Sequence, residues 1–84
     1  MPSESKRRLN ERKFPNWEEL ANKGGRRYWV DVVGRYGWKA RYVKEVDKHE
    51  ETLRFYQEIF NDKGALVEVH EKFPFDREHK RAEG

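Results

Sequence analysis

The sequence predicts an α+β fold that is mostly β: a four-stranded antiparallel meander of two hairpins with a short N-terminal helix. Apolar and polar residues alternate between Arg26 and Phe73, which is the period of strands with one buried face. Gly37 and Gly64 each end a short linker between two such runs, as in hairpin turns. Aromatic residues make up 14% of the chain and can supply a core. One small domain is therefore expected.

The N-terminal part is predicted to divide into an arm and a helix. Residues 1–13 contain one large aliphatic residue, Leu9, so they are expected to form a mobile basic arm. A helix is predicted from Asn16 to about Lys23, because Asn16 and Glu19 have the spacing of a capping box. In this motif the Asn16 side chain caps the helix, and the Glu19 side chain accepts a hydrogen bond from the Asn16 backbone N–H. A pair of glycines then ends this helix. Its buried side would consist of Trp17, Leu20 and Ala21.

The first hairpin is expected to join strands at 26–33 and 38–46. Its linker, Gly34 to Gly37, predicts a type I turn that ends in a left-handed glycine. This turn sets Gly34 opposite Trp38, so the apolar sets of both strands fall on one face. The expected cross-strand pairs are Val32 with Ala40 and Val30 with Tyr42.

The second hairpin is expected to join strands at 52–61 and 65–73 through Asn61-Asp62-Lys63-Gly64, with glycine again in fourth place. Asn61 should lie opposite Ala65. The pairs that follow are Ile59 with Val67 and Gln57 with Val69 on one face, and Phe60 with Leu66 and Tyr56 with His70 on the other.

The two hairpins are expected to join through residues 47–51 into one sheet. One register places Glu45 opposite Arg54 and Arg41 opposite Glu58, which pairs opposite charges across the strands. A shift of two residues would place Lys39 opposite Glu58 instead, and the sequence leaves both registers open.

Beyond the last strand, Pro74 is expected to end the sheet and Asp76 to cap a short C-terminal helix. The domain would span residues 14–76, followed by a charged tail at 77–84. Its core face would collect Tyr28, Val30, Val32, Trp38, Ala40, Tyr42, Val46, Leu53, Phe55, Ile59, Val67, Val69 and Phe73. Four strands span ~15–20 Å and one helix about 10 Å. The sheet must therefore curl, a second chain must cover it, or the helix must include part of residues 4–13.

Composition excludes several classes of protein. The net charge is +3, and the absence of cysteine excludes disulfides, cysteine zinc sites and thiol nucleophiles. No run approaches the ~20 apolar residues of a membrane span, and the N-terminus has no signal-peptide core, so a cytoplasmic protein is expected. The abundance of Lys, Arg and Glu is typical of proteins from hot environments.

The predicted outer face of the sheet carries aromatic and basic side chains together. Such a face suits stacked bases and phosphates, which makes RNA or a protein the expected partner. The same residues could instead pack as rings against long Lys and Arg stems, or form a homodimer face. The candidate binding residues are Trp29, Lys39, Arg41, Arg54 and Tyr56.

An enzymatic alternative uses His70 as acid or base, with Tyr56 and Arg54 beside it to hold phosphate, as in a small metal-free ribonuclease. A metal on His70, His79 and a carboxylate matches no strong spacing motif, so neither a metal nor a cofactor is predicted. A third interpretation is a structural subunit whose apolar face is covered by another chain.

Three segments carry a resemblance to a known family: Arg41 to Asp47, Thr52 to Ile59 and Leu66 to Pro74. Together they resemble a family of short prokaryotic proteins of unknown function, over about half the chain. This resemblance implies the fold unit and no activity. The Tyr-rich strands and the late Phe-Pro and His are similar, more faintly, to TumE-like and RelE-like toxins, which implies an RNA target. RelE-like toxins place two substantial helices before the meander, whereas one short helix is predicted here.

Overall fold

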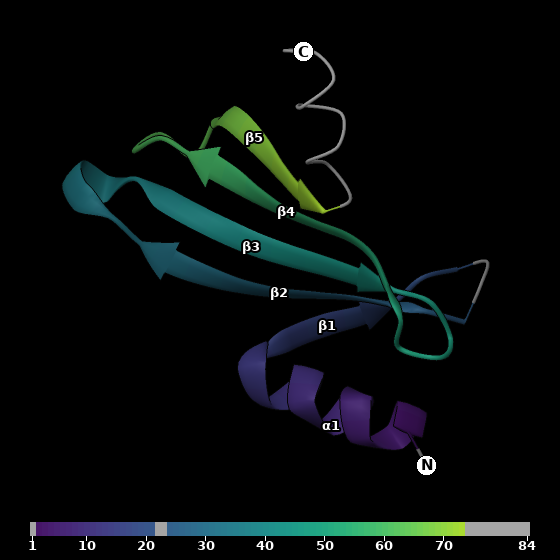
Figure 1. The fold of residues 1–84 in the computed structure, drawn as a ribbon. Coiled ribbons are helices and arrows are strands. Elements are labelled where there is room, and N and C mark those ends of the chain that lie inside the picture. The colour runs from purple at the N-terminus through teal and green to yellow at the C-terminus, as the bar shows by residue number, and fades with distance from the viewer. Residues whose placement is uncertain (1, 22–23, 74–84) are drawn as a thin grey trace, which may run out of the picture.

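The computed structural model describes residues 2–21 and 24–73. They form one helix and one antiparallel sheet whose strands follow one another in chain order, β1-β2-β3-β4-β5 (Figure 1). The fold is therefore α+β and mostly β, as predicted, but the sheet has five strands rather than four. The elements are α1 (Pro2–Lys13), β1 (Asn16–Glu19), β2 (Arg26–Val33), a short 3₁₀ turn (Arg35–Gly37), β3 (Lys39–Val46), β4 (Thr52–Phe60) and β5 (Leu66–Phe73).

The N-terminal prediction is wrong in its assignment of the helix. The segment expected to be an arm is α1, and the segment expected to be a helix begins with β1. The charges suit this placement, because Glu4 lies in the first turn and the basic Arg12 and Lys13 lie in the last turn, which matches the helix dipole. Asn16 and Trp17 belong to an edge strand instead of a helical cap.

A buried carboxylate holds α1 to the sheet. Glu50 lies in the loop between β3 and β4, and its side chain is fully buried. It accepts hydrogen bonds from Asn10 Nδ2 at 3.0 Å, from Tyr28 Oη at 2.9 Å and from Arg7 Nε at 3.1 Å. Phe14 adds an apolar contact, because its ring lies 5.9 Å from that of Tyr28. The helix is thus attached mainly by polar groups.

The first hairpin has the predicted register and a different turn. Val30 lies opposite Tyr42 and Val32 opposite Ala40, as predicted, and Gly34 donates its N–H to the Trp38 carbonyl oxygen at 2.7 Å. Tyr36 and Gly37 both have positive φ, 56° and 81°. Positive φ at both central positions is typical of a type I′ turn, so the predicted type I turn is wrong although the left-handed glycine is confirmed.

The central register is the one that pairs opposite charges. Arg41 lies opposite Glu58 and Glu45 opposite Arg54, and the shifted alternative is excluded. The second turn is also as predicted: Asn61 and Ala65 are hydrogen-bonded at 3.0 Å, and Gly64 has a φ of 83°. The Asn61 side chain reinforces this turn, because its Oδ1 accepts from the N–H groups of Lys63 and Ala65.

Beyond the turn at Asn61 and Ala65, the predicted pairing of β4 with β5 holds only at Phe60 and Leu66. A bulge follows at once, so Ile59 lies opposite Glu68 rather than Val67, and His70 lies opposite Gln57 rather than Tyr56. Each bulge adds an unpaired residue to one strand and shifts every later pair. A second irregularity brings Phe55 opposite Phe73.

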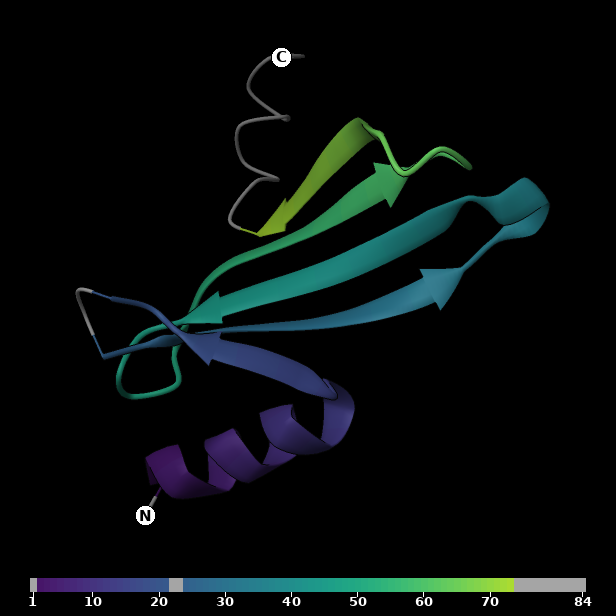
Figure 2. The same ribbon diagram turned by 180° about the vertical axis from the view of Figure 1, so that it is seen from behind.

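The sheet has two unlike faces. We call the side that α1 contacts the helix face and the other side the arginine face. Both ribbon views show α1 beside β1 and away from β4 and β5 (Figures 1 and 2). The helix face carries Trp17, Tyr28, Val30, Val32, Ala40, Tyr42, Lys44, Val46, Phe55, Gln57 and Ile59, and the arginine face carries Arg27, Trp29, Asp31, Lys39, Arg41, Val43, Glu45, Arg54, Tyr56, Glu58 and Phe60.

The core is smaller than the sequence predicts. On the helix face the buried apolar residues are Phe14, Tyr28 and Val46, and on the arginine face they are Val43 and Tyr56. Six members of the predicted core face are between 42% and 50% exposed instead of buried: Val32, Trp38, Leu53, Val67, Val69 and Phe73. One helix docked at one end of the sheet leaves this surface open.

Candidate functional site

The arginine face brings together the predicted binding residues Trp29, Arg41 and Tyr56 from three adjacent strands. They line a hollow of about 350 Å³ that also includes Glu18, Arg27, Val43 and Glu58. The predicted residues Lys39 and Arg54 lie outside this hollow, toward opposite ends of the face. The rings and cations interact directly, because the Arg54 guanidinium lies 4.1 Å from the Tyr56 ring centroid and that of Arg41 lies 5.8 Å from the Trp29 ring.

Every basic side chain of this face already has an acidic partner. Arg41 binds both carboxylate oxygens of Asp31, at 2.7 and 3.1 Å, and Lys39 lies 3.5 Å from the same carboxylate. The hydrogen bond from Arg41 holds the pKa of Asp31 below its ordinary value. The other pairs are Arg54 with Glu71, and Arg27 with both Glu18 and Glu45.

The carboxylates of the arginine face outnumber its cations. The carboxylates are Glu18, Asp31, Glu45, Glu58 and Glu71, and the cations are Arg27, Lys39, Arg41 and Arg54. Proteins bind a phosphate backbone through Lys and Arg side chains, which displace the counterions of the phosphates. The Lys and Arg side chains of this face are instead paired with carboxylates of the same domain. The face is therefore poorly suited to a polyanion, even though its residue types suggested one.

The three residues of the catalytic alternative are divided between the two faces. His70 lies opposite Gln57 on the helix face and contacts Glu68 at 2.9 Å. Tyr56 lies on the arginine face, where its hydroxyl donates to Glu45 at 3.2 Å. Burial, and then the Glu45 carboxylate, raises the pKa of Tyr56, so its hydroxyl stays protonated near neutral pH. The bulge in β5 is the physical cause of this separation.

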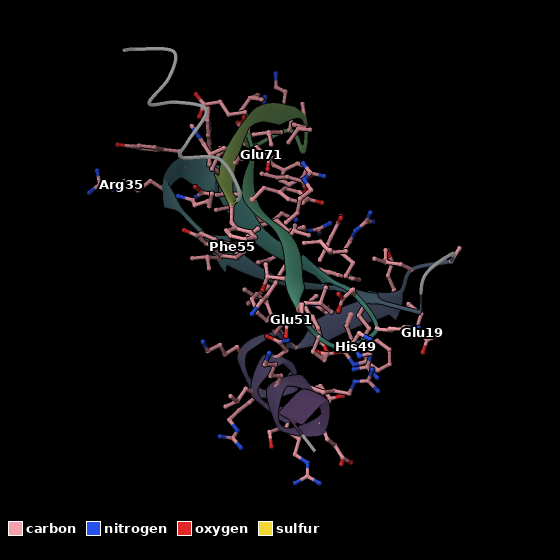
Figure 3. All side chains as sticks on the ribbon, turned by 45° about the vertical axis from the view of Figure 1, so that its right-hand side comes forward. Glu19, Arg35, His49, Glu51, Phe55 and Glu71 are labelled. Carbon is pink, nitrogen blue, oxygen red and sulfur yellow. The ribbon has the colours of Figure 1, made fainter. Side chains whose placement is uncertain are left out.

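The helix face contains an apolar groove that the sequence did not indicate. Phe14, Phe55 and Phe73 line it together with Lys13, Lys44, Glu51 and Thr52, in a volume of about 510 Å³. Figure 3 shows Phe55 and Glu51, two of the residues that line this groove, and Glu51 lies beside α1. The three rings come from the residue after α1, from β4 and from the last residue of β5, which are far apart in sequence. We call this site the phenylalanine groove.

Two lysines give the phenylalanine groove a positive side. Burial lowers the pKa of Lys44, and repulsion from Lys13 lowers it further, while attraction to the Glu50 carboxylate opposes both effects. Lys44 donates a hydrogen bond to the neutral Asn10 Oδ1 at 2.9 Å, and neither lysine forms an ion pair with any residue in 2–21 or 24–73. The only carboxylate in the lining, Glu51, is held by Lys6 on the other side. The groove thus combines apolar walls with two lysines that form no ion pair within the described residues.

Comparisons with known proteins give no relative: the chain matches no protein-family model, and no curated protein or solved structure is significantly similar to it. The resemblances described above therefore add no assignment. In the described part of the chain, no helix is long and apolar enough to cross a membrane.

The described residues also contain no cluster of three or more His, Asp or Glu side chains arranged to hold a metal ion. His79, the short helix expected after Pro74 and the tail at 77–84 lie outside the described residues.

Proposed function

We propose that this chain is a non-enzymatic binding domain that holds a segment of a partner protein in the phenylalanine groove. The partner segment has apolar side chains for the three rings and a carboxylate for Lys13 and Lys44. The observation that carries this proposal is the groove itself, in which phenylalanine rings and two cations without acidic partners in the described chain line one cavity of about 510 Å³.

Burial and charge both support a protein segment as the ligand. Phe73 is 45% exposed, and the neighbouring Tyr42 and Phe55 are only partly buried against the core. Covering each aromatic ring contributes about 25 cal/mol for every Å² of apolar surface removed from water. A carboxylate that enters beside Lys44 also relieves the repulsion between the two lysines, which gives the site a preference for acidic ligands.

RNA is the competing partner, and it would use the arginine face. There the bidentate pair of Arg41 with Asp31 would have to break before Arg41 could bind phosphate. The ribonuclease alternative is less favoured still, because His70 and Tyr56 lie on opposite faces. The partner protein is therefore the better supported proposal.

The test begins with peptide display against the immobilised protein, followed by titration of a selected peptide into ¹⁵N-labelled protein. We expect selected peptides to combine acidic and large apolar residues, and to shift the amide signals of Phe14, Phe55 and Phe73. Lys13→Glu and Phe73→Ser should each weaken binding about tenfold, which corresponds to ~1.4 kcal/mol. Lys63→Glu in the second turn and Val33→Ser on the arginine face are the matched controls, and both should leave binding unchanged.

Two results would overturn the proposal. One is selection of peptides without acidic residues whose binding ignores Lys13→Glu. The other is binding of a short single-stranded RNA that shifts Trp29, Arg41 and Tyr56, weakens as salt is raised and is lost in Arg41→Glu, because that result assigns the domain to nucleic acid.

A further inference from the structure

The outer edge of the sheet is an eight-residue strand with no strand beside it in the described chain. β5 is last in the strand order, and all eight of its residues are exposed. Four of them are large and apolar: Leu66, Val67, Val69 and Phe73 are between 43% and 50% exposed. An edge of this length and apolarity readily pairs with another strand.

The sequence of β5 is complementary to itself when read in the antiparallel direction. About a two-fold axis through His70, Glu68 of one copy lies opposite Lys72 of the other, and Val69 lies opposite Glu71. The regular stretch of β5 is Glu68 to Glu71, because the bulges leave Val67 and Lys72 without partners in β4, so the Glu–Lys pairs lie at the two ends of this stretch. The axis repeats the Glu–Lys pair, and opposite charges across strands are stabilising.

The neighbouring register is disfavoured by the same charges. A slip by one residue in one direction places Glu68 of one copy opposite Glu71 of the other, which brings like charges together twice. The opposite slip places Glu68 opposite Phe73, so neither slip forms the Glu–Lys pairs. The charges on β5 therefore act in two ways: they discourage pairing with unrelated strands, and they permit self-pairing in the register centred on His70.

We infer that two copies of this chain associate through β5, edge to edge and antiparallel about His70, so that their two sheets become one continuous sheet. The surface is the edge of the sheet rather than the phenylalanine groove, so this inference does not rest on the proposed function. Such a dimer is isologous, because the same strand is used by both copies. It also covers apolar edge side chains that the monomer leaves in water.

The experiment is a charge exchange read by light scattering and analytical ultracentrifugation. The wild-type protein should have twice its chain mass of 10.3 kDa. Glu68→Lys places Lys opposite Lys and Lys72→Glu places Glu opposite Glu, so each single variant should weaken dimerisation at least tenfold. The double variant E68K/K72E restores both pairs in exchanged positions and should return the affinity to within about threefold of wild type. Lys63→Glu, an equal charge change off the strand, should leave the mass unchanged.

Circular dichroism of each variant confirms that the fold is retained, which the exposed positions of Glu68 and Lys72 favour. A wild-type mass of 10.3 kDa at a concentration of hundreds of micromolar would overturn the inference. So would a dimer that both single variants preserve, or one that the double variant fails to restore. Peptide binding in the groove is measured separately, so loss of dimer and loss of groove binding are distinguishable.

Discussion

Glu50 offers the sharpest test of how the helix is attached. In Glu50→Ala, the buried Asn10 amide and the Tyr28 hydroxyl lose their common acceptor, while the partly exposed Arg7 can return to water. Each buried donor left without a partner costs about 1–3 kcal/mol, so we expect a loss of about 3 kcal/mol in the free energy of unfolding. A domain of 84 residues has ~4–12 kcal/mol in total, so this is a large fraction.

The assay is urea denaturation followed by far-ultraviolet circular dichroism. With a slope of about 1–3 kcal/mol per M, the midpoint should fall by ~1 M or more. Glu51→Ala is the matched control, because Glu51 is exposed and, among residues 2–21 and 24–73, forms an ion pair only with exposed Lys6. That surface pair should contribute below about 1 kcal/mol. If Glu50→Ala costs no more than Glu51→Ala, the buried carboxylate does not hold the helix and the reasoning is refuted.

The backbone at Glu50 allows a second comparison at the same position. Its φ is +66°, in the left-handed region that costs a residue with a side chain roughly 1–2 kcal/mol. Glu50→Gly removes the same hydrogen bonds as Glu50→Ala and relieves this strain. The glycine variant should therefore be the more stable of the two by about 1 kcal/mol. The opposite order would show that the loop rearranges when Glu50 is lost.

Three further changes test other parts of the fold. Because Arg41 lowers the pKa of Asp31, this carboxylate adds stability above about pH 4 that is lost as the pH falls through its folded pKa; Asp31→Asn should therefore show a shallower acid loss in urea titrations at several pH values, and an unchanged slope would contradict the pairing. Phe14→Ala should lower stability by ~3–5 kcal/mol and reduce helical dichroism, whereas full helicity would show that α1 docks without it. Gly25→Ala would place its Cβ 2.0 Å from the Val46 carbonyl oxygen, so we expect a loss of about 1–3 kcal/mol in thermal or urea unfolding; a neutral result would show that the backbone yields there.

The positions of the two hairpin turns could be predicted because glycine is favoured where φ is positive, and both Gly37 and Gly64 occupy such positions. The type of the first turn could not, because Tyr36 also has a positive φ. The register of β2 with β3 could be predicted because apolar alternation and the turn position agree on it. For β3 with β4 the sequence left two registers open, and the structure has the one in which Arg41 faces Glu58.

The strand β5 was predicted, but its register with β4 could not be, because its side chains are half-exposed on both faces. Val67 and Val69 are 43% and 48% exposed, so apolar character does not decide which face either one occupies. A bulge then costs no burial, and nothing in the alternation indicates it. The prediction that His70 lies opposite Tyr56 was wrong because the sequence does not indicate this bulge. The catalytic alternative depended on that prediction.

The helix was missed for a different reason. Sequence patterns identify helices by an apolar stripe, and the only large aliphatic residue of α1, Leu9, is 52% exposed. The polar residues that do attach it, Arg7 and Asn10, meet Glu50 only in the folded chain. The pairing of Lys13 with Lys44 in the phenylalanine groove could not be predicted for the same reason, because the two residues come from separate elements that meet only in the folded chain.

The position of α1 at one end of the sheet has a consequence for hydrogen exchange. Buried residues are concentrated where the helix meets β2 and the loop after β3: Phe14, Tyr28, Val46 and Glu50. In contrast, β5 contains no buried residue. Amide protons of β2 and β3 should therefore exchange only through global unfolding, and those of β5 through frequent local opening. A partner strand or second copy along β5 would slow exchange there first, which makes the exchange rates of this edge a direct report of occupancy.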